Sequence, residues 1–297
     1  MKKRKPLVSI IVNCYNGSEF LREALRSLKM QTYKNFEVIF WDNRSTDDSK
    51  KIFNSLKDKR FRYFLANKRT PLYCARNLAI KKSKGQFISF LDADDLWLPK
   101  KLSLQIPLFK NPEVGVVYSK LLIYNNSTKK KKIHVNRNLA EGKIFDKIIN
   151  NYNVGIITTV IRRKYFLELK KKFDQRYTHI GDFDLFLRLS KICEFRAIQE
   201  PTAIYRAHGK NLTTIDRFGS IKEFENWLKE NRKNLNTTQL NGIESLINYK
   251  KFIFYKLNDK FLNALKIFFI GKSFSISIKK ILILLIPSKI LQKIFWY

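Results

Sequence analysis

The first 120 residues alternate between short apolar runs and amphipathic segments. The apolar runs show no helical period, and they lie at 7–12, 36–41, 61–65 and 86–91. Segments 17–29 and 71–83 instead place apolar residues at helical spacing, and Ser45-Thr46-Asp47-Asp48 is typical of a helix start. Strands separated by helices in this way predict an α/β fold with a mostly parallel sheet flanked by helices.

The following hundred residues are less regular, and after about residue 220 the pattern is helical throughout. We expect strands at 114–124, 155–161 and 203–206, a polar loop at 125–132, and helices at 143–150 and from Gly181 onward. The sequence therefore predicts a mixed second half of the globular part, followed by a C-terminal helical extension.

An acidic cluster, Asp92-Ala93-Asp94-Asp95, comes directly after the predicted strand at 86–91. Open α/β sheets bind ligands at the carboxyl ends of their strands. Like charges this close repel each other, and a divalent cation that prefers oxygen ligands would relieve the repulsion. The alternative is an acidic turn that caps the next helix, in whose first turn Pro99 would lie.

Positive charge dominates the composition. Lys and Arg number 59 against 25 Asp and Glu, which gives a net charge of +34. This excess predicts anionic partners, namely nucleotide phosphates, an anionic membrane surface or nucleic acid, although a lysine-rich solvated surface accounts for part of it. No basic motif with interleaved aromatic residues stands out, so we expect no nucleic acid.

The cysteines and apolar windows indicate a cytoplasmic protein. The three cysteines are widely spaced and form no CxxC pair, which fits a reducing compartment. The apolar stretch at 7–12 is too short for a signal peptide. No window reaches transmembrane length, because Pro287 ends the best candidate at 281–286.

The C-terminal segment is basic and amphipathic. From Lys260 to the end there are seven lysines and no acidic residue. Two predicted helical faces carry the apolar residues Ile278, Ile281, Leu282 and Leu285, then Ile290, Leu291, Ile294 and Phe295, with Lys289 and Lys293 opposite the second face. Trp296 and Tyr297 close the chain. This pattern favours an interfacial helix on anionic lipid; the alternative is a helical hairpin packed on the main domain or on a second subunit.

Five motifs, in order, resemble those of the family 2 glycosyltransferases. They are Val8 to Asn16, Gln31 to Asp47, Ala75-Arg76-Asn77, Phe90 to Asp95 and Gly181 to Leu185. The resemblance implies a GT-A fold over residues 1–219, with a Rossmann-like nucleotide-sugar half at about 6–110 and an acceptor half at about 111–219. Residues 220–297 would be the helical, basic, membrane-associating extension.

The resemblance also implies an inverting, metal-dependent transfer from a nucleoside-diphosphate sugar, with UDP as the expected nucleotide. Asp94 matches the metal ligand of the family's DxD motif, and Mn²⁺ or Mg²⁺ is the expected ion. Asp92 would lie nearer the ribose. Asp95 stays open between a metal ligand and an acceptor-side group. His208 looks like the family's C-terminal histidine, which contacts the metal or diphosphate; a packing or surface histidine is the alternative.

Asp182 matches the family's catalytic base. Inversion needs a base on the face opposite the leaving group, and apolar neighbours at a helix start can raise the pKa of such a carboxylate. Asp184 is the alternative base, and a helix cap is the structural alternative for Asp182. Many family members carry Glu before this Asp, whereas this chain carries Gly181.

The resemblance assigns nucleotide binding to residues near the ends of the first strands. Asn13 and Tyr15 would line the base pocket, Asp42 would accept from the uracil imide, and Arg76 would approach the base or phosphates. Asn43-Arg44 stand where the family often has Asp-Gly, and Asn13 where Pro or Thr is frequent, so the identity of the base is open. A capped turn for Asp42 and a surface helix position for Arg76 are the alternatives.

These observations together predict a hexosyl- or N-acetylhexosaminyltransferase of surface polysaccharide, lipopolysaccharide or glycolipid assembly. The acceptor would be a saccharide or a lipid-linked sugar, reached from the inner face of the plasma membrane. A sugar-nucleotide-binding relative without transfer activity and a nucleotidyltransferase are the alternatives. The second lacks support, because no glycine-rich phosphate loop is visible.

Overall fold

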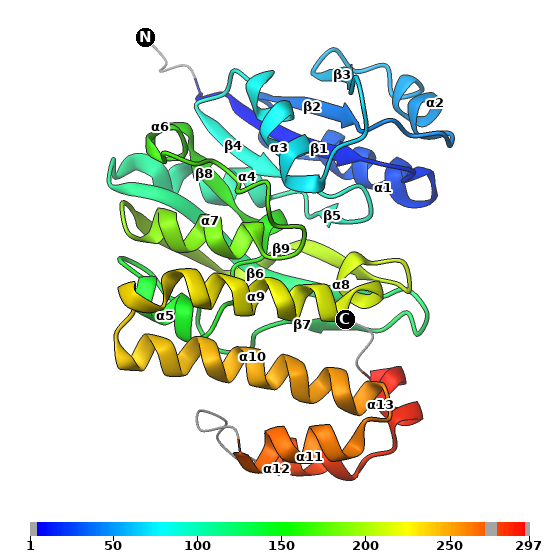
Figure 1. Cartoon of the computed structure of the whole chain (residues 1–297). Coiled ribbons are helices and arrows are strands. Elements are labelled where there is room, and N and C mark those ends of the chain that lie inside the picture. The colour runs from blue at the N-terminus through cyan, green and yellow to red at the C-terminus, as the bar shows by residue number, and fades with distance from the viewer. Residues whose placement is uncertain (1–4, 271–277, 295–297) are drawn as a thin grey trace. The chain divides into compact units, whose positions relative to one another are not determined.

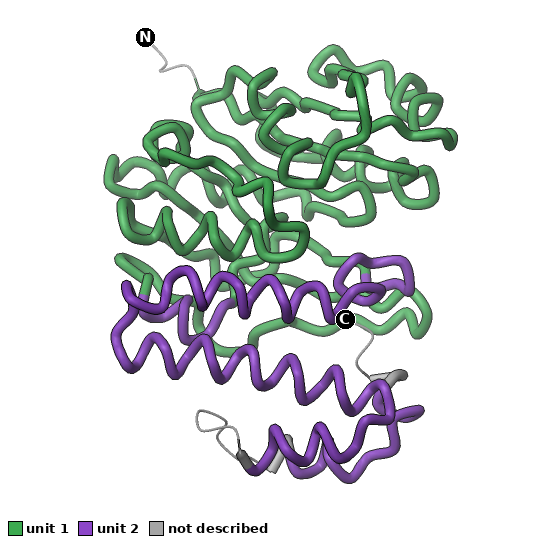
Figure 2. Tube along the Cα trace, in the orientation of Figure 1, with its two compact units in different colours: residues 1–145, 153–206 green, residues 146–152, 207–297 purple. Residues whose placement is uncertain are grey.

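The computed structural model describes residues 5–270 and 278–294 (Figure 1). The chain forms two compact units, which consist of residues 1–145 with 153–206 and of residues 146–152 with 207–297 (Figure 2). The domain boundary expected near residue 219 from the family resemblance stays a prediction.

The nucleotide half of the first unit is a parallel sheet. Its strands are β1 (Val8–Cys14), β2 (Phe36–Asp42), β3 (Phe61–Leu65) and β4 (Phe87–Phe90), in the order β3-β2-β1-β4. The connecting helices are α1 (Ser18–Lys29), α2 (Ser49–Asn54) and α3 (Leu72–Lys81). Every residue of β2 is buried, as expected of a strand covered on both faces. In the register, Cys14 lies opposite Asp42, so the ends of β1 and β2 meet at one edge.

Antiparallel pairings extend this sheet beyond β4, and the described residues place nine strands in it. The added strands are β5 (Leu96–Trp97), β6 (Val114–Asn125), β7 (Lys131–Ile133), β8 (Val160–Arg162) and β9 (Glu194–Ala207). The helical elements are α4 (Lys101–Gln105), η1 (Ile106–Lys110), α5 (Phe145–Asn150), η2 (Ile156–Thr158), α6 (Arg163–Glu168) and α7 (Gly181–Ser190). The α/β prediction is thereby confirmed, with parallel strands where the motifs for nucleotide binding lie.

Two of the predicted elements differ from the structure. The expected strand at 155–161 is instead the 3-10 helix η2 followed by the short β8, because the Thr158 and Thr159 hydroxyls donate back to the Gly155 and Ile156 carbonyls, at 2.7 and 2.8 Å. Pro99 does not open a helix: α4 begins at Lys101, and the preceding Leu96–Trp97 pair with β9.

Strand β9 is much longer than the expected 203–206, and it pairs with β5 through Ile204 and Ala203. The predicted polar loop at 125–132 contains a turn that leads into β7, whose residues pair with Leu122 to Tyr124. Local apolar pattern could not reveal either feature, since both depend on which distant strand is available for pairing.

The second unit is helical in its described residues. After α8 (Leu212–Ile215) come α9 (Arg217–Asn231), η3 (Arg232–Asn234), α10 (Thr237–Leu257), α11 (Phe261–Ile270), α12 (Ile278–Leu285) and α13 (Ser288–Ile294). A capping box starts α10, in which Asn236 and Gln239 bond each other's backbone amides. A buried apolar cluster joins α10 to α11, α12 and α13 through Phe252, Phe268, Ile283 and Leu291.

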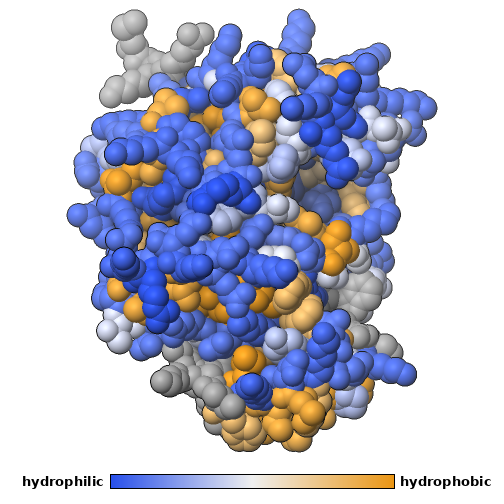
Figure 3. Space-filling model, viewed as in Figure 1, coloured by the Kyte–Doolittle hydropathy of each residue, from blue (hydrophilic) through white to orange (hydrophobic). Residues whose placement is uncertain are grey.

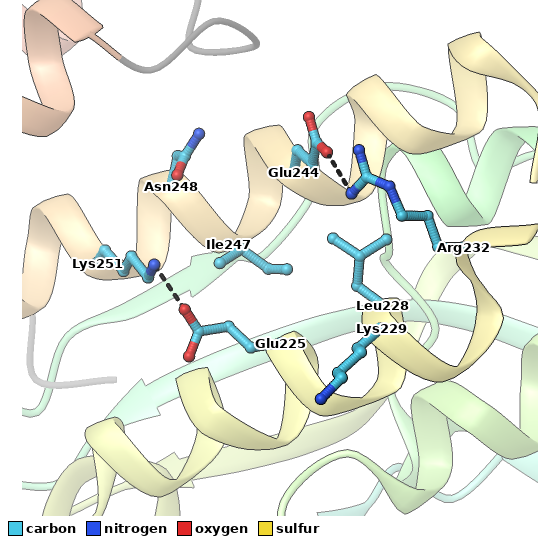
Figure 4. Close-up of a pocket in the computed structure, with 8 residues that line it drawn as sticks. All are labelled: Glu225, Leu228, Lys229, Arg232, Glu244, Ile247, Asn248 and Lys251. Carbon is cyan, nitrogen blue, oxygen red and sulfur yellow. Dashed lines mark hydrogen bonds and ion pairs between the residues drawn. The ribbon is translucent and has the colours of Figure 1, made fainter.

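A pocket lies between α9 and α10, and its apolar floor is Leu228 and Ile247 (Figure 4). Ion pairs cross it from Lys251 to Glu225 at 2.6 Å and from Arg232 to Glu244 at 3.1 Å. None of its lining residues belongs to the predicted active site. Among the residues that the structure describes, no helix has both the length and the apolar character needed to span a bilayer.

Candidate active site

The acidic cluster forms a tight turn directly after β4. The Asp95 amide donates to the Asp92 carbonyl at 3.1 Å, and the Leu91 amide still donates to Ile11 of β1 at 3.0 Å. The three carboxylates meet different surroundings, since Asp92 and Asp94 are partly exposed whereas Asp95 is only 1% exposed. The turn therefore presents two of its three carboxylates at the carboxyl edge of the sheet.

Asp95 holds the acidic turn against β9. Its carboxylate accepts from the Arg206 amide at 2.8 Å, while the Arg206 guanidinium donates to the Asp94 carbonyl at 3.0 Å and pairs with Glu23 at 2.5 Å. Burial raises the pKa of Asp95 well above its usual range, and the charges of Asp94 and Asp92 add to this. The structure thus gives Asp95 a structural contact that the sequence analysis did not foresee.

Arg76 of α3 is a buried cation, not a surface helix residue. Its side chain lies among aromatic rings, at 5.3 Å from the centroid of Tyr73 and 5.9 Å from those of Phe90 and Phe173. It is 2% exposed, and its guanidinium pairs with the Asp92 carboxylate at 2.5 Å. An arginine desolvated in this way gives a strong, oriented hydrogen bond. Arg76 therefore fixes the direction of the Asp92 side chain.

Asp182 lies in the first turn of α7, and its carboxylate accepts from the Tyr73 hydroxyl at 3.2 Å and from the Phe183 amide at 2.9 Å. It does not cap the helix, because the residue at the cap position is Ile180. Burial raises the pKa of Asp182, while the charge of Arg76 and the two hydrogen bonds oppose this rise. A raised pKa suits a carboxylate that accepts a proton during the reaction.

Helix α3 joins the acidic turn to Asp182. Tyr73 and Arg76 are three residues apart on it, so they share one helix face. Through these two side chains, α3 contacts Asp182 and Asp92 at the same time. Two segments that are far apart in sequence thus form one site within the first unit.

Packing against Tyr73 explains why position 181 carries a residue without a side chain. A Cβ atom at this position would lie 2.6 Å from two carbons of the Tyr73 ring, which is closer than real side chains approach. Tyr73 is itself buried and stacks on Phe173, with centroids 5.2 Å apart. The Tyr73 ring therefore occupies the space that a side chain at position 181 would need.

Asp184, the alternative base, lies in a different environment from Asp182. It accepts two bonds from the Arg188 side chain, at 2.9 Å and 2.7 Å, one helical turn further on. Arg188 also donates to the Lys172 carbonyl at 2.7 Å. This ion pair fastens α7 to the preceding loop.

The carboxyl ends of β1 and β2 carry the predicted nucleotide residues. Asp42 is buried at the end of β2, and its two oxygens accept from the Ser45 amide at 2.7 Å and from the Tyr63 hydroxyl at 2.6 Å. The next residue, Asn43, bonds the backbone of Thr70 through both its amide oxygen and its amide nitrogen. These contacts order the loop that leads into α3.

Three further features mark this edge. Arg44 has a φ of 71°, which is the left-handed conformation that a glycine would adopt more easily. The amide nitrogen of Asn13 is buried and has no hydrogen-bond partner among the described residues. The exposed ring of Tyr15 is covered on one face by the Arg69 guanidinium, at 3.9 Å from the ring centroid.

His208 lies in the second unit, where it forms a local loop with its neighbours. Its Nδ1 accepts from the Lys210 amide at 3.2 Å, and its Nε2 lies 3.1 Å from the Asn211 amide nitrogen. The ring is largely buried, so a surface position is excluded. A role for His208 at the metal stays a prediction.

The donor set at the acidic turn fits a cation shared with a substrate. Among the residues that the structure describes, no three His, Cys, Asp or Glu side chains converge to hold a metal ion. Mg²⁺ usually binds one or two carboxylates together with substrate phosphates, and seldom an all-protein cage. Asp94 matches that pattern, because it is partly exposed and its neighbour Asp92 is paired with Arg76.

Sequence reasoning missed several residues that build this site, namely Tyr63, Tyr73, Arg206 and Asn43. Each acts through a contact with a residue at least 20 positions away. Tyr73 alone left a signal, since it lies three positions before Arg76 in the same predicted helix.

Comparison with known proteins agrees with this geometry. The family model described as Glycosyl transferase family 2 matches residues 9–189. The Escherichia coli UDP-Glc:alpha-D-GlcNAc-diphosphoundecaprenol beta-1,3-glucosyltransferase WfgD is 31% identical over 65% of this chain and 73% of its own. The amylovoran biosynthesis glycosyltransferase AmsB of Erwinia amylovora is 28% identical over 86% of this chain and 87% of its own. In several other matching relatives the matched regions span only 30% to 47% of their length.

Among solved structures, the mannosyltransferase PcManGT from Pyrobaculum calidifontis, in complex with GDP-Man and Mn²⁺, superposes with a TM-score of 0.64. The superposition covers 99% of this chain and 82% of the other, at 15% sequence identity, and so bears on the fold alone. The sequence match, the ordered motifs and the GT-A fold agree, and the family expected from the motifs is confirmed. The chain belongs to glycosyltransferase family 2.

Proposed function

We propose that this protein is a metal-dependent, inverting glycosyltransferase of cell-surface polysaccharide assembly. It would move a hexosyl or N-acetylhexosaminyl group from a UDP-sugar to a saccharide or lipid-linked acceptor. The name of WfgD specifies UDP-Glc and a diphosphoundecaprenol-linked sugar, and AmsB is named for amylovoran biosynthesis. Those names motivate the donor and acceptor classes proposed for this chain.

The observation that carries this proposal is the double contact of α3. Arg76 bonds Asp92 of the acidic turn at 2.5 Å, and Tyr73 bonds Asp182 at 3.2 Å. A transferase needs one group that neutralises a leaving diphosphate and another that takes a proton from the acceptor. Helix α3 here contacts both the acidic turn, which carries the proposed metal ligand Asp94, and the proposed base Asp182.

The reaction follows from these roles. An acceptor hydroxyl attacks the anomeric carbon of the donor, and its proton passes to the Asp182 carboxylate. The new carbon–oxygen bond forms as the bond from the anomeric carbon to the β-phosphate oxygen breaks, and that oxygen keeps the electron pair. Attack opposite the leaving group inverts the anomeric configuration, so one base suffices and no covalent intermediate is required.

Asp94 would hold the divalent cation, Mn²⁺ or Mg²⁺, and the role of His208 at the metal stays a prediction. When bound, such an ion neutralises the charge that develops on the departing nucleoside diphosphate. Asp92, oriented by Arg76, would accept hydrogen bonds from the ribose hydroxyls. PcManGT was solved with Mn²⁺, which supports the choice of metal.

Asn13, Tyr15 and Asp42 would form the base pocket. The buried amide nitrogen of Asn13 still has a hydrogen to donate, and a base carbonyl could accept it. Each oxygen of Asp42 already accepts one bond but retains a second lone-pair site for an imide N–H. These features support uracil as the base.

The test is a binding panel with UDP, GDP, dTDP and their sugars, each with Mn²⁺, Mg²⁺ or EDTA. We expect UDP compounds to bind, and to bind at least about tenfold more weakly in EDTA, because the metal neutralises part of the diphosphate charge. Isothermal titration calorimetry gives the affinity, and UDP release with added lipid-linked acceptor gives turnover. Equal binding with and without metal would overturn the metal dependence.

We further propose that the C-terminal helices rest on an anionic membrane at its cytoplasmic face. Figure 3 shows hydrophobic residues gathered at the lower edge of the view, where Figure 1 places α11 and α12. The exposed apolar side chains are Phe261, Leu262, Phe269, Ile281, Leu282, Leu285 and Ile290. Lys260, Lys266 and Lys289 are exposed on the same helices or at their ends, in a segment without acidic residues.

The helices form their own core, which corrects part of the predicted amphipathic face. Leu291 was expected to face lipid, but it is buried with Ile283 against α10 and α11. Ile281, Leu282, Leu285 and Ile290 keep the expected outward position. Ile278, Lys293 and the residues from 294 onward have side chains outside the described residues. Exposed apolar groups beside lysines are the usual signature of a helix in the interface plane.

Replacing Leu262 and Leu285 by glutamine should weaken binding to vesicles of anionic phospholipid by about 30-fold. Both side chains are about three-quarters exposed, so the double change should leave folding intact. Leu167→Gln with Ile215→Gln is the matched control, because these residues are comparably exposed on α6 and α8. Vesicle co-flotation measures the effect. Unchanged flotation, or a change of oligomeric state instead, would contradict the membrane role.

A further inference from the structure

Tyr73 packs against the start of α7 and bonds the proposed base. It is 2% exposed, and its hydroxyl reaches the Asp182 carboxylate at 3.2 Å and the His179 carbonyl at 3.4 Å. Its ring stacks on Phe173, and it lies so close to Gly181 that no Cβ would fit there. The hydroxyl is therefore held at a fixed place beside Asp182.

We propose that Tyr73 is a positioning residue for the base, which it serves by donating its hydroxyl hydrogen to the Asp182 carboxylate. This inference rests on the proposed function of Asp182. A phenol has one hydrogen to give, and an ionised carboxylate is a stronger acceptor than the backbone carbonyl of His179. Together with the Phe183 amide at 2.9 Å, the hydroxyl fixes the orientation of the carboxylate.

The electrostatics favour a permanent donor. Burial and the charge of Asp182 raise the pKa of Tyr73 well above its usual range, so the phenol keeps its proton. The bond that it donates stabilises the ionised form of Asp182 and opposes the rise in pKa caused by burial. Among the charged groups that act on this pair are Arg76 from α3 and Asp92 of the acidic turn.

Orientation matters because proton transfer depends on the direction of the accepting lone pair. A carboxylate that could rotate would present the wrong oxygen for part of the time, and a misplaced catalytic group lowers the rate without weakening donor binding. The Tyr73 hydroxyl of α3 and the Phe183 amide in the first turn of α7 both donate to the carboxylate and so restrict its rotation. Removing the hydroxyl should therefore act on kcat and on the pH profile.

The test is Tyr73→Phe, which keeps the ring over Gly181 and removes the hydroxyl. We expect kcat to fall about tenfold with the donor KM unchanged. The acid limb of the pH profile of kcat/KM should move to higher pH, because the pKa of Asp182 rises when the donated bond is lost. Tyr165→Phe is the matched control, since Tyr165 is also buried and donates to a carbonyl, that of Pro112.

An unshifted acid limb with wild-type kcat would overturn the positioning role. If Asp182→Asn is inactive while Tyr73→Phe keeps the wild-type profile, only this inference fails. If Asp182→Asn keeps its turnover, the proposed function fails. If Tyr73→Phe does not fold, a ring-fluorinated tyrosine at position 73 is the second variant. It retains the packing and its hydroxyl is a stronger hydrogen-bond donor, so the acid limb of the pH profile should move to lower pH. An unmoved limb in that protein would overturn the inference equally.

Discussion

Replacing Asp182 with asparagine should lower kcat for sugar transfer by about 1,000-fold, because an amide cannot take the proton of the acceptor hydroxyl. Asparagine has nearly the same shape, and its oxygen can still accept from Tyr73 and from the Phe183 amide. The first turn of α7 should therefore stay intact, and so should binding of UDP with metal. Steady-state kinetics with a lipid-linked acceptor gives kcat, and calorimetry gives the UDP affinity.

Asp184→Asn is the comparator on the same helix. It removes the negative charge of the ion pair with Arg188, which fastens α7 to the preceding loop, and it should reduce thermal stability more than kcat. The wild-type enzyme should also lose kcat/KM as the pH falls through the raised pKa of Asp182, because only the ionised carboxylate accepts a proton. Near-normal turnover of Asp182→Asn would show that the base lies elsewhere.

The second large effect is expected from Asp94→Asn, which should weaken metal-dependent UDP binding by about 100-fold. The carboxylate is partly exposed at the acidic turn, so its loss should cost the fold little. Binding measured in EDTA should stay the same in wild type and variant. The measurement is calorimetric titration of UDP with saturating Mn²⁺ and again with EDTA.

Asp95→Asn separates metal binding from structural support at the same turn. Its carboxylate is buried and accepts from the Arg206 amide, a bond that the asparagine oxygen can still accept, so this variant should stay folded and keep the ratio of UDP affinities with and without metal. If Asp94→Asn kept the full metal dependence, or if Asp95→Asn alone lost it, the assignment of the metal ligand within the turn would be wrong.

Local pattern predicted the frame of this molecule well. The alternation of apolar runs and amphipathic segments gave the strands β1 to β4 and the helices between them, because each signal lies within its own element. The motifs also predicted the family, because each of them lies within a short stretch of sequence. The pattern failed where pairing is non-local, as for β5, which exists only because β9 extends alongside it.

The site shows the same limit at the level of single side chains. Asp94 and Asp95 are adjacent and chemically identical, yet one is partly exposed and the other bonds the backbone of a strand 111 positions later. Likewise, nothing near Arg76 in the sequence distinguishes a surface residue from a buried partner of Asp92. Such roles are set by which distant segment folds against the residue.

The contact between Gly181 and Tyr73 has a consequence for evolution and for protein engineering. A side chain at position 181 would collide with the ring, and a smaller residue at position 73 would leave a void beside the base. We therefore expect the two positions to be coupled: a side chain at position 181 needs a smaller residue at position 73. Libraries that vary the surroundings of the base should therefore mutate both codons together, so that a larger residue at position 181 is sampled with a smaller one at position 73.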